Sequence, residues 1–476
     1  MDVASFVVIV GLVGVVIVVA ALLSGVIERT AFPQVLVFLL LGAALGPAGL
    51  KILDLGLTSP AVHIIATLSL VLVLFTDAVS LDLSEVRKHA SLALLVLGPG
   101  TILCAGLIAV LAWLLLHLSP LQATITGAAL ASTDPVLLRG LLLRRDVPTS
   151  ARLGLRLESG LNDVVLLPIV VAAIACAGTQ AGGGSNVAWG RLLLELFVLG
   201  PGAGCAVGLV AVLALDRVRK RLGVRRDYES LYALGVAFTA YAAAEMLHGS
   251  GFLAAFAAGI TITALDVELC DCFLEYGETT AEMALLLTFV VLGSSLFWSG
   301  FTVLCGATLV FAAAALLVRP IALTASLTSL HLERSSRRLI AWFGPRGLSS
   351  LLLVLLAVFA GVPGSERLFS ICCLVVLLSV LLHGGWPMWL AWSRRPRAGV
   401  TPAPPPASDP RLGIDQLEQL RQSGQPVIVL DARTERSYAA SDASAAGALR
   451  LAPDDVPRRA RELGLDRDAW LVAFCA

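Results

Sequence analysis

The stretch LRLESGLNDVVLLPIVVA, residues 155–172, is an apolar segment that opens with a polar turn. Its second half is almost wholly apolar, as in a helix that crosses a bilayer. The polar turn before it contains two carboxylates, a hydroxyl and an amide, in Glu158, Asp163, Ser159 and Asn162. An ionisable group at the centre of a membrane helix costs roughly 2.5–3.5 kcal/mol on insertion scales. Because two such groups in one turn are costly, we expect them to have a function, and this turn is the first candidate site.

The composition places much of the chain in a lipid bilayer. Of its 476 residues, 58% are apolar and only 14% are charged, and the mean hydropathy is +0.89. A soluble globular domain carries about 25% charged residues. The nine cysteines lie scattered in apolar stretches and indicate small buried side chains, without a disulfide framework. No His/Cys cluster has metal-ligand spacing, so no catalytic zinc or iron site is predicted. We also predict no cofactor, no enzyme activity and no nucleic-acid partner.

Long apolar runs broken by Gly, Pro or charge predict about 13 membrane crossings. Their approximate ranges are 4–27, 33–49, 60–79, 90–116, 120–143, 150–177, 191–215, 229–247, 249–265, 280–298, 301–328, 338–361 and 367–385. The first run is too long for a cleaved signal peptide and is predicted to be a retained span. Basic residues gather in alternate loops, as in DRVRKRLGVRRD (216–227). Because basic loops stay cytoplasmic, we predict a plasma-membrane protein with its N-terminus outside and its C-terminus in the cytoplasm.

The chain also divides by composition into three parts. Residues 1–393 form the predicted transmembrane domain. Residues 394–410 are rich in Pro and Ala, which predicts an extended, semi-rigid linker. Residues 411–476 have the composition of a soluble domain and are predicted to form a small cytoplasmic segment.

A second polar motif lies halfway along the predicted span 120–143, in ASTDPVLLRG (131–140). Pro135 removes a backbone donor and breaks the helical ladder, which frees carbonyls such as that of Thr133. Broken helices in transporters hold ions at such points. In the first motif, residues four apart share a helix face, which pairs Ser159 with Asp163. Carboxylate, hydroxyl and carbonyl oxygens suit hard cations, so the two motifs together predict a cation site.

These motifs, in this order, resemble those of the monovalent cation/proton antiporters of the sodium/proton exchanger type. STDPV is similar to the family's Thr-Asp-Pro motif, carried by Thr133, Asp134 and Pro135, and ESGLND to its Glu-Ser-x-x-Asn-Asp motif. GSGFLAAFAAGI (249–260) is similar to the family's Gly-rich span. LVRPIAL and FGPRGLSSLLL are similar to its two late helices that carry Arg319 and Arg346. The resemblance covers nearly the whole membrane domain.

The resemblance implies a fold and a transport cycle. The fold is an all-α polytopic bundle of inverted repeats, with crossed discontinuous helices and a mobile core that moves against a dimerisation domain in a homodimer. The activity is exchange of Na⁺, or Li⁺, for protons by alternating access, with K⁺/H⁺ exchange as the nearest alternative. Such an exchanger would serve pH homeostasis. The Asn162-Asp163 pair in the motif implies electroneutral exchange of one cation for one proton.

The resemblance also assigns roles to single residues. Asp163 is the carboxylate that takes either the cation or a proton. Asp134, Ser159 and the Thr133 carbonyl complete the Na⁺ shell. Glu158 has a structural role in an ion pair with an arginine, with Arg319 as the first choice and Arg346 as the other late arginine.

One segment departs from the family pattern. Relatives carry Phe-Glu-Gly-Gly-Leu in the third span, where this chain has LFTDAVSLDL (74–83). Thr76 takes the position of the glutamate and Asp77 follows it. Two interpretations remain open: Asp77 reaches the ion site after a small helix rotation, or it caps the cytoplasmic vestibule.

The C-terminal segment resembles the first half of a rhodanese domain, which implies a small α/β fold. Asp431 and Arg433 match its Asp-x-Arg motif, Tyr438 its helix and Cys475 its nucleophile. The usual Gly-His-Ile-Pro-Gly-Ala segment is replaced by SDASAAGA (441–448), and the loop that would wrap the Cys475 sulfur is missing. Sulfur transfer is therefore not expected. A regulatory, redox-sensing or sulfur-sensing role stays open, and it defines the rival class: a sulfur- or redox-responsive membrane protein that acts through this tail.

Overall fold

The computed structural model describes most of the membrane-embedded part of the chain and short segments of the tail. The described residues are 10–22, 34–53, 55–81, 83–142, 147–181, 189–222, 226–265, 271–330, 332–385, 417–418, 420, 427–433, 438, 445, 447–451 and 470–474. The chain separates into two compact units, Met1–Arg394 and Arg395–Ala476. The predicted linker 394–410 and Cys475 lie outside the described residues.

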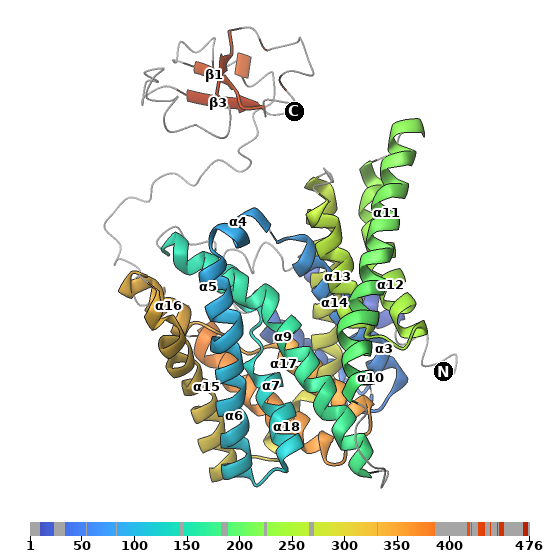
Figure 1. The fold of residues 1–476 in the computed structure, drawn as a ribbon, viewed down its shortest axis with the longest axis vertical. Coiled ribbons are helices and arrows are strands. Elements are labelled where there is room, and N and C mark those ends of the chain that lie inside the picture. The colour runs from blue at the N-terminus through green and yellow to red at the C-terminus, as the bar shows by residue number, and fades with distance from the viewer. Residues whose placement is uncertain are drawn as a thin grey trace. The chain divides into compact units, whose positions relative to one another are not determined.

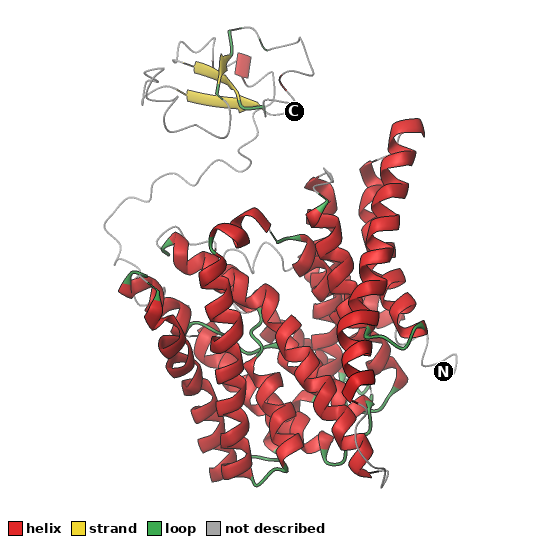
Figure 2. Cartoon of the chain, viewed as in Figure 1, coloured by secondary structure: helices red, strands yellow, loops and turns green. Residues whose placement is uncertain are grey.

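The first unit is built from helices (Figures 1 and 2). Its first half contains helix Val10–Leu22, α2 (Gln34–Leu45), α3 (Pro60–Val79), α4 (Leu83–Lys88), α5 (Ala90–Leu95), η1 (Val96–Gly100), α6 (Thr101–Leu116), α7 (Pro120–Ala131), α8 (Pro135–Leu142) and α9 (Thr149–Ala181). Its second half contains α10 (Trp189–Leu194), η2 (Glu195–Leu199), α11 (Gly200–Leu222), α12 (Arg226–Met246), α13 (Gly251–Ala264), α14 (Asp271–Ser294), η3 (Phe297–Phe301), α15 (Gly306–Ser326), η4 (Leu327–Ser329), α16 (Arg334–Trp342), α17 (Leu348–Phe359), α18 (Ser365–Ser379) and η5 (Val380–Gly385).

Six helical stretches among the described residues are long and apolar enough to cross a membrane. They are Pro60–Val79, Ala90–Leu116, Thr149–Gly178, Trp189–Val218, Gly306–Ser329 and Ser365–His383. Shorter apolar helices lie beside them, α2, α13 and α17 among them. The first unit is therefore an all-α, multi-pass membrane domain, and the bilayer environment is the one that the composition predicted. The count of about 13 crossings stays a prediction.

The predicted span 120–143 is two helices separated by a break. Helix α7 starts in a capping box, in which the Gln122 N–H donates to Ser119 Oγ (3.3 Å) and the Ser119 N–H donates to Gln122 Oε1 (3.1 Å). It ends at Ala131, and the next residue, Ser132, is extended (φ −61°, ψ 140°). Helix α8 begins at Pro135. Proline is favoured at the first position of a helix because an N–H there would have no acceptor within the helix, and proline has no N–H. We call residues 132–134 the first break.

The predicted span 338–361, expected as one continuous crossing, is also interrupted. Helix α16 ends at Trp342 and α17 starts at Leu348, and the residues between them, 343–347, form the second break. Arg346 therefore lies in non-helical backbone, and its assignment to a late helix is corrected. Pro345 within this segment explains part of the interruption, because a proline disfavours helical backbone in the residue before it.

The helices of the first unit fall into two groups by their mutual packing. The first group consists of α2, α3 and α10–α14, and the second of α5–α9 and α15–α18. The two groups lie on the right and left of Figure 1, respectively. They meet chiefly where α3 packs against α9 and α17, and where α14 meets η3. One continuous apolar core crosses this boundary, while a smaller cluster around Phe75 lies within the first group.

The second unit contains a parallel three-stranded sheet in the order β2-β1-β3, formed by β2 (Leu449–Arg450), β1 (Val427–Asp431) and β3 (Trp470–Phe474). Asp431 ends the central strand and forms a buried ion pair with Arg433 (Oδ2–Nη2 2.6 Å). Hydrogen bonds from Arg433 hold the pKa of Asp431 below its usual value. The Arg433 guanidinium also lies over the rings of Tyr438 and Phe474, 5.2 and 5.6 Å from their centroids. The rhodanese resemblance of this unit stays a prediction.

Candidate functional site

The two breaks are joined by the backbone and side chain of Asp134. The Asp134 N–H donates to the Pro345 carbonyl (3.0 Å), and the Leu348 N–H donates to Asp134 Oδ2 (2.7 Å). Leu348 is the first residue of α17, so the Asp134 carboxylate lies at the positive end of that helix dipole. This buried carboxylate, 2% exposed, is held by the second break.

Arg346 provides the reciprocal contact at the end of α7. Its Nη1 donates to the carbonyls of Ala131 (2.5 Å) and Ser132 (3.1 Å), where a cation is favoured by the helix dipole. Its Nη2 donates to Cys104 Sγ (3.4 Å) and its backbone N–H to Ser379 Oγ (2.7 Å). Each break therefore supplies the charge that stabilises a helix end at the other.

Glu158 and Arg319 form a buried ion pair between α9 and α15, and both are about 3% exposed. Nη1 of Arg319 donates to Oε1 of Glu158, and Nη2 donates to Oε2 (2.8 Å). Nη2 also donates to the carbonyls of Ile340 (2.8 Å) and Phe343 (3.0 Å), at the end of α16. Arg346, the other predicted partner, makes no ion pair with a described carboxylate. Its assignment to an ion pair is corrected, because its donors reach backbone carbonyls and a thiol.

Asp163 lies on α9, buried and facing the first break. Its Oδ1 accepts a hydrogen bond from Ser132 Oγ at 2.6 Å, and it makes no ion pair with any described residue. The neighbouring Asn162 is fully buried and donates from Nδ2 to Thr133 Oγ1 (2.8 Å). Its Oδ1 has no hydrogen-bond partner among the described residues. A buried acceptor without a donor is costly, so this position fits a water or a cation.

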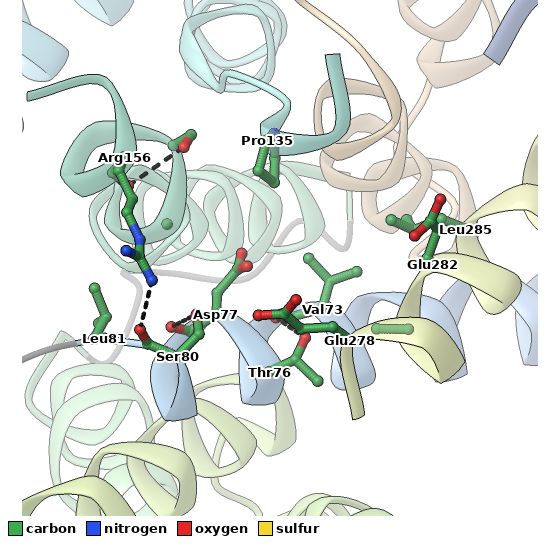
Figure 3. A pocket seen from close by; sticks show the side chains of 13 residues that line it. Val73, Thr76, Asp77, Ser80, Leu81, Pro135, Arg156, Glu278, Glu282 and Leu285 are labelled. Carbon is green, nitrogen blue, oxygen red and sulfur yellow. Dashed lines mark hydrogen bonds between the residues drawn. The ribbon is translucent and has the colours of Figure 1, made fainter. Parts of the chain in front are cut away.

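A cavity of about 200 Å³ opens beside these residues, at the boundary between the two helix groups (Figure 3). Its lining from α14, α3 and the two residues after α3 consists of Val73, Thr76, Asp77, Ser80, Leu81, Glu278, Ala281, Glu282 and Leu285. Its lining from α8 and α9 consists of Pro135, Arg156, Ser159 and Gly160. Asp77 and Glu278 project into it (Figure 3), and Glu278 and Arg156 are solvent-exposed. Solvent therefore reaches the cavity.

The cavity ends within one helical turn of Asp163. Ser159 lines it and lies four residues before Asp163, on the same face of α9. The Ser159 hydroxyl donates to the Arg156 carbonyl at 3.4 Å. Asp77 is close enough for its charge to interact with those of Asp163 and Asp134. Three carboxyl groups thus share one region, and like charges in a low-dielectric site repel one another.

Thr76, which takes the position of the family's glutamate, has its hydroxyl turned back on its own helix. Thr76 Oγ1 donates to the carbonyls of Leu72 (2.8 Å) and Val73 (3.1 Å). Thr76 still lines the cavity. Across the cavity mouth, Arg156 Nη2 donates to the Ser80 carbonyl (3.1 Å), which joins α9 to the end of α3.

Two residues of this region were not among the predicted site residues. Ser132 donates to Asp163, and Gly347 lies so close to Asp134 that an added Cβ would be 2.0 Å from Oδ2. Ser132 stood in the quoted motif beside Thr133. The direction of a side chain in non-helical backbone does not follow from helical periodicity, so the sequence offered no means of choosing between the two hydroxyls.

The site is thus a buried carboxylate cluster at two helix breaks, which hydrogen bonds join, in a multi-pass membrane protein. The family model described as "Sodium/hydrogen exchanger, transmembrane" matches residues 14–392. The chain belongs to the sodium/hydrogen exchanger family.

Curated relatives of the chain carry antiporter names. It is 25% identical to the K(+)/H(+) antiporter NhaP of Alkalimonas amylolytica over 79% of this chain and 64% of that protein. It is 27% identical to the K(+)/H(+) antiporter NhaP2 of Shewanella sp. (strain MR-4) over 83% of this chain and 68% of that protein. The chain therefore spans about two thirds of the length of these relatives. It is also 28% identical to the Na(+)/H(+) antiporter NhaS2 of Synechocystis sp. over 51% of this chain and 43% of that protein.

The fold is similar to that of a solved antiporter. The sodium proton antiporter MjNhaP1 from Methanocaldococcus jannaschii superposes with a TM-score of 0.62 over 81% of this chain and 98% of that structure, at 20% identity. At this identity the likeness concerns the fold alone. It supports the prediction of a helical fold of the antiporter type. In this chain, the helix breaks at residues 132–134 and 343–347 are joined by hydrogen bonds.

Proposed function

We propose that the chain exchanges a monovalent cation for protons across a membrane, with the cation and the proton competing for Asp163. Family membership and the antiporter names of the relatives support this class of function, which is transport and not enzymatic catalysis. Na⁺, or Li⁺, is the first candidate, as the sequence resemblance implies. K⁺ is the alternative, because two of the relatives named above are K⁺/H⁺ antiporters.

The observation that carries the proposal is the setting of Asp163: buried, without an ion pair to a described residue, and one turn from a solvent-reached cavity. A buried carboxylate is stable only when its charge is neutralised or strongly hydrogen-bonded. A proton and a cation both neutralise it, and one carboxylate does not hold both at once. Competition between them couples the two gradients.

The donors around Asp163 fit a hard cation. Asp163, Asp134, Ser159 and the Thr133 carbonyl are proposed as the Na⁺ ligands, and all four residues are buried. Oxygen donors without nitrogen or sulfur suit alkali cations. The unpartnered Oδ1 of Asn162 adds one more acceptor nearby. For Asp77, its position on the cavity wall supports the vestibule interpretation, where it would attract cations toward the site.

The two helix groups supply the moving parts that alternating access requires. The cavity lies on their boundary, at the end of α3 that the basic loops assign to the cytoplasm. In this orientation the conformation is inward-facing, and sliding of the second group against the first would move Asp163 toward the outer side. We further propose electroneutral exchange, a homodimer and a plasma-membrane location. The sulfur- or redox-responsive alternative depends on Cys475, which lies outside the described residues.

The experiment that tests the proposal uses everted vesicles with a pH-sensitive dye. Na⁺, Li⁺ and K⁺ are added in turn to vesicles that contain the chain and to vesicles without it. Dye recovery with Na⁺ or Li⁺ supports the first candidate, and equal recovery with K⁺ moves the assignment to a potassium or mixed exchanger. If the protein is folded and no cation causes dye recovery, the proposal is contradicted.

Gly347→Ala should slow exchange because the new Cβ would overlap the Asp134 carboxylate. Displacement of that carboxylate by about 1 Å predicts a fall in rate of up to about 100-fold. The measurements are the initial rate of exchange in reconstituted vesicles and the melting temperature of the purified protein. Gly106→Ala on α6 is the matched control, because its Cβ meets nothing within 4 Å. A Gly347→Ala protein that transports like wild type would show that the close approach is dispensable.

A further inference from the structure

Helix α16 presents a basic face that the exchange mechanism does not use. Arg334, Arg338 and Trp342 follow one another at intervals of four residues, so they share one face of the helix. All three residues are exposed, and for Trp342 the exposed fraction is 49%. Arg337, three residues after Arg334, borders the same face. We call these four residues the α16 stripe.

The positive charge of the α16 stripe has no counter-charge among the described residues. None of its arginines makes an ion pair with a described carboxylate. Their side-chain hydrogen bonds reach only backbone carbonyls, from Arg337 Nη2 to Leu330 (2.9 Å) and from Arg338 Nε to Arg334 (3.3 Å). Nε of Arg337 is buried and has no acceptor among the described residues. Like charges three and four residues apart on a helix repel one another, so the stripe favours an anion.

The helices that pack against α16 supply no free carboxylate. These helices are α15 and α9. Helix α15 carries no acidic residue, and on α9 Glu158 is bound by Arg319 while Asp163 is buried and faces the first break. Glu333, directly before α16, is exposed and makes no side-chain capping bond. The described part of the chain therefore leaves the α16 stripe open to an anion from its surroundings.

The α16 stripe lies where the bundle meets the surface of the bilayer. The membrane-spanning stretch Gly306–Ser329 ends just before it, and ERSSRR (333–338) is one of the basic loops that the sequence assigns to the cytoplasm. Helix α16 lies at the same end of the membrane unit as α4, which carries Arg87 and Lys88 (Figure 1). Along the stripe, arginines give way to an exposed tryptophan, and tryptophan is enriched at the boundary between membrane and water.

We propose that the α16 stripe binds the phosphate headgroups of anionic phospholipids, such as phosphatidylglycerol, in the cytoplasmic leaflet. Guanidinium groups match the charge and the geometry of phosphate oxygens. Helix α16 leads into the second break, where the Phe343 carbonyl accepts from Arg319, so a bound headgroup would stabilise this end of the membrane unit. The stripe is separate from the carboxylate cluster, and the proposal does not depend on the proposed exchange.

The test measures lipid binding to the purified full chain in neutral detergent. Brominated phosphatidylglycerol serves as a quencher of tryptophan fluorescence, and the signal of Trp342 is the difference between wild type and Trp342→Phe. We expect phosphatidylglycerol to quench this signal and to raise the melting temperature. Brominated phosphatidylcholine, whose headgroup has no net charge, should do neither at the same concentration. Choline chloride should weaken the binding, because salt screens the attraction between exposed charges.

Arg334→Gln/Arg338→Gln removes two exposed charges and leaves the hydrogen bond from Arg337 to Leu330 in place. Each arginine near an anionic surface contributes about fivefold, so the affinity for phosphatidylglycerol should fall roughly 30-fold. Arg334→Lys/Arg338→Lys keeps both charges and should recover most of the affinity.

The matched control is Arg191→Gln/Arg367→Gln. It removes the same charge from two exposed arginines of α10 and α18, at the predicted outer ends of the spans 191–215 and 367–385. This control should bind phosphatidylglycerol like wild type.

Three results would overturn the proposal. They are equal affinities of wild type and Arg334→Gln/Arg338→Gln for phosphatidylglycerol, equal quenching of Trp342 by phosphatidylcholine, and an equal rise of the melting temperature with inorganic phosphate. The last result would indicate a site for free anions in place of lipid. None of these measurements uses transport, so failure of the proposed exchange in vesicles would leave their outcome unchanged.

Discussion

Asp163→Asn abolishes cation-driven proton movement in reconstituted vesicles, while the protein folds and inserts like wild type. The amide has nearly the same shape, and its oxygen still accepts from Ser132 Oγ, as Oδ1 of Asp163 does now at 2.6 Å. It neither releases a proton nor neutralises a cation, so the competition on which exchange depends is lost. The expected rate equals that of protein-free vesicles at every pH, with Na⁺, Li⁺ or K⁺.

A matched control neutralises a carboxylate elsewhere in the membrane unit. Glu366 is exposed in the first turn of α18, so Glu366→Gln should leave the rate unchanged. The melting temperature of both variants shows that the protein is folded. Exchange by Asp163→Asn at any pH would refute the assignment and make Asp134 the next carboxylate to test.

Loss of one partner of the Glu158–Arg319 ion pair should be the most destabilising change in the membrane unit. Arg319→Met leaves Glu158 as a buried charge without its partner, and such losses cost about 3–5 kcal/mol. It also removes the donor that holds the carbonyls of Ile340 and Phe343 at the second break. The measurement is thermal unfolding of the purified protein in detergent, and the melting temperature should fall well below that of wild type.

Two further variants test the physical reason. In Glu158→Leu/Arg319→Met neither charge remains, so a large part of the lost stability should return. Arg191→Met breaks the Arg191–Glu195 pair, whose Nε–Oε1 distance is 2.6 Å but whose arginine side chain is 72% exposed. An exposed pair contributes about 0–1 kcal/mol, so this control should barely change the melting temperature. Equal melting temperatures for Arg319→Met and wild type would show that the buried pair does not stabilise the fold.

Several features of this protein were predictable because their causes are local in the chain. The low charge and the long apolar runs require a bilayer, and α3 has the bounds 60–79 that its apolar run predicted. The first break follows from Pro135, whose ring and missing N–H act within one helical turn. The i, i+4 spacing that joins Ser159 to Asp163 is also local, because both residues lie in one continuous helix, α9.

The position of Arg346 could not be predicted from its neighbours in the sequence. The sequence placed it on a helix and near an ion pair, whereas it lies in the second break and donates to the carbonyls at the end of α7. Pro345 explains part of the interruption at 343–347, and groups from distant helices hold the backbone of this segment. Among these groups are Arg319, which binds the Phe343 carbonyl, and Ser379, which binds the Arg346 N–H.

The amino-acid sequence alone identifies this chain as a multi-pass membrane protein with buried carboxylates at a broken helix. The packed fold is needed to show that Arg319 pairs with Glu158, that the Ser132 hydroxyl faces Asp163, and where solvent reaches the cluster. The physical reason is the separation of the partners: Glu158 and Arg319 are 161 residues apart, and Ala131 and Arg346 are 215 apart. Periodicity and propensity act over one or two turns, while these contacts exist only after helices far apart in the chain have packed against one another.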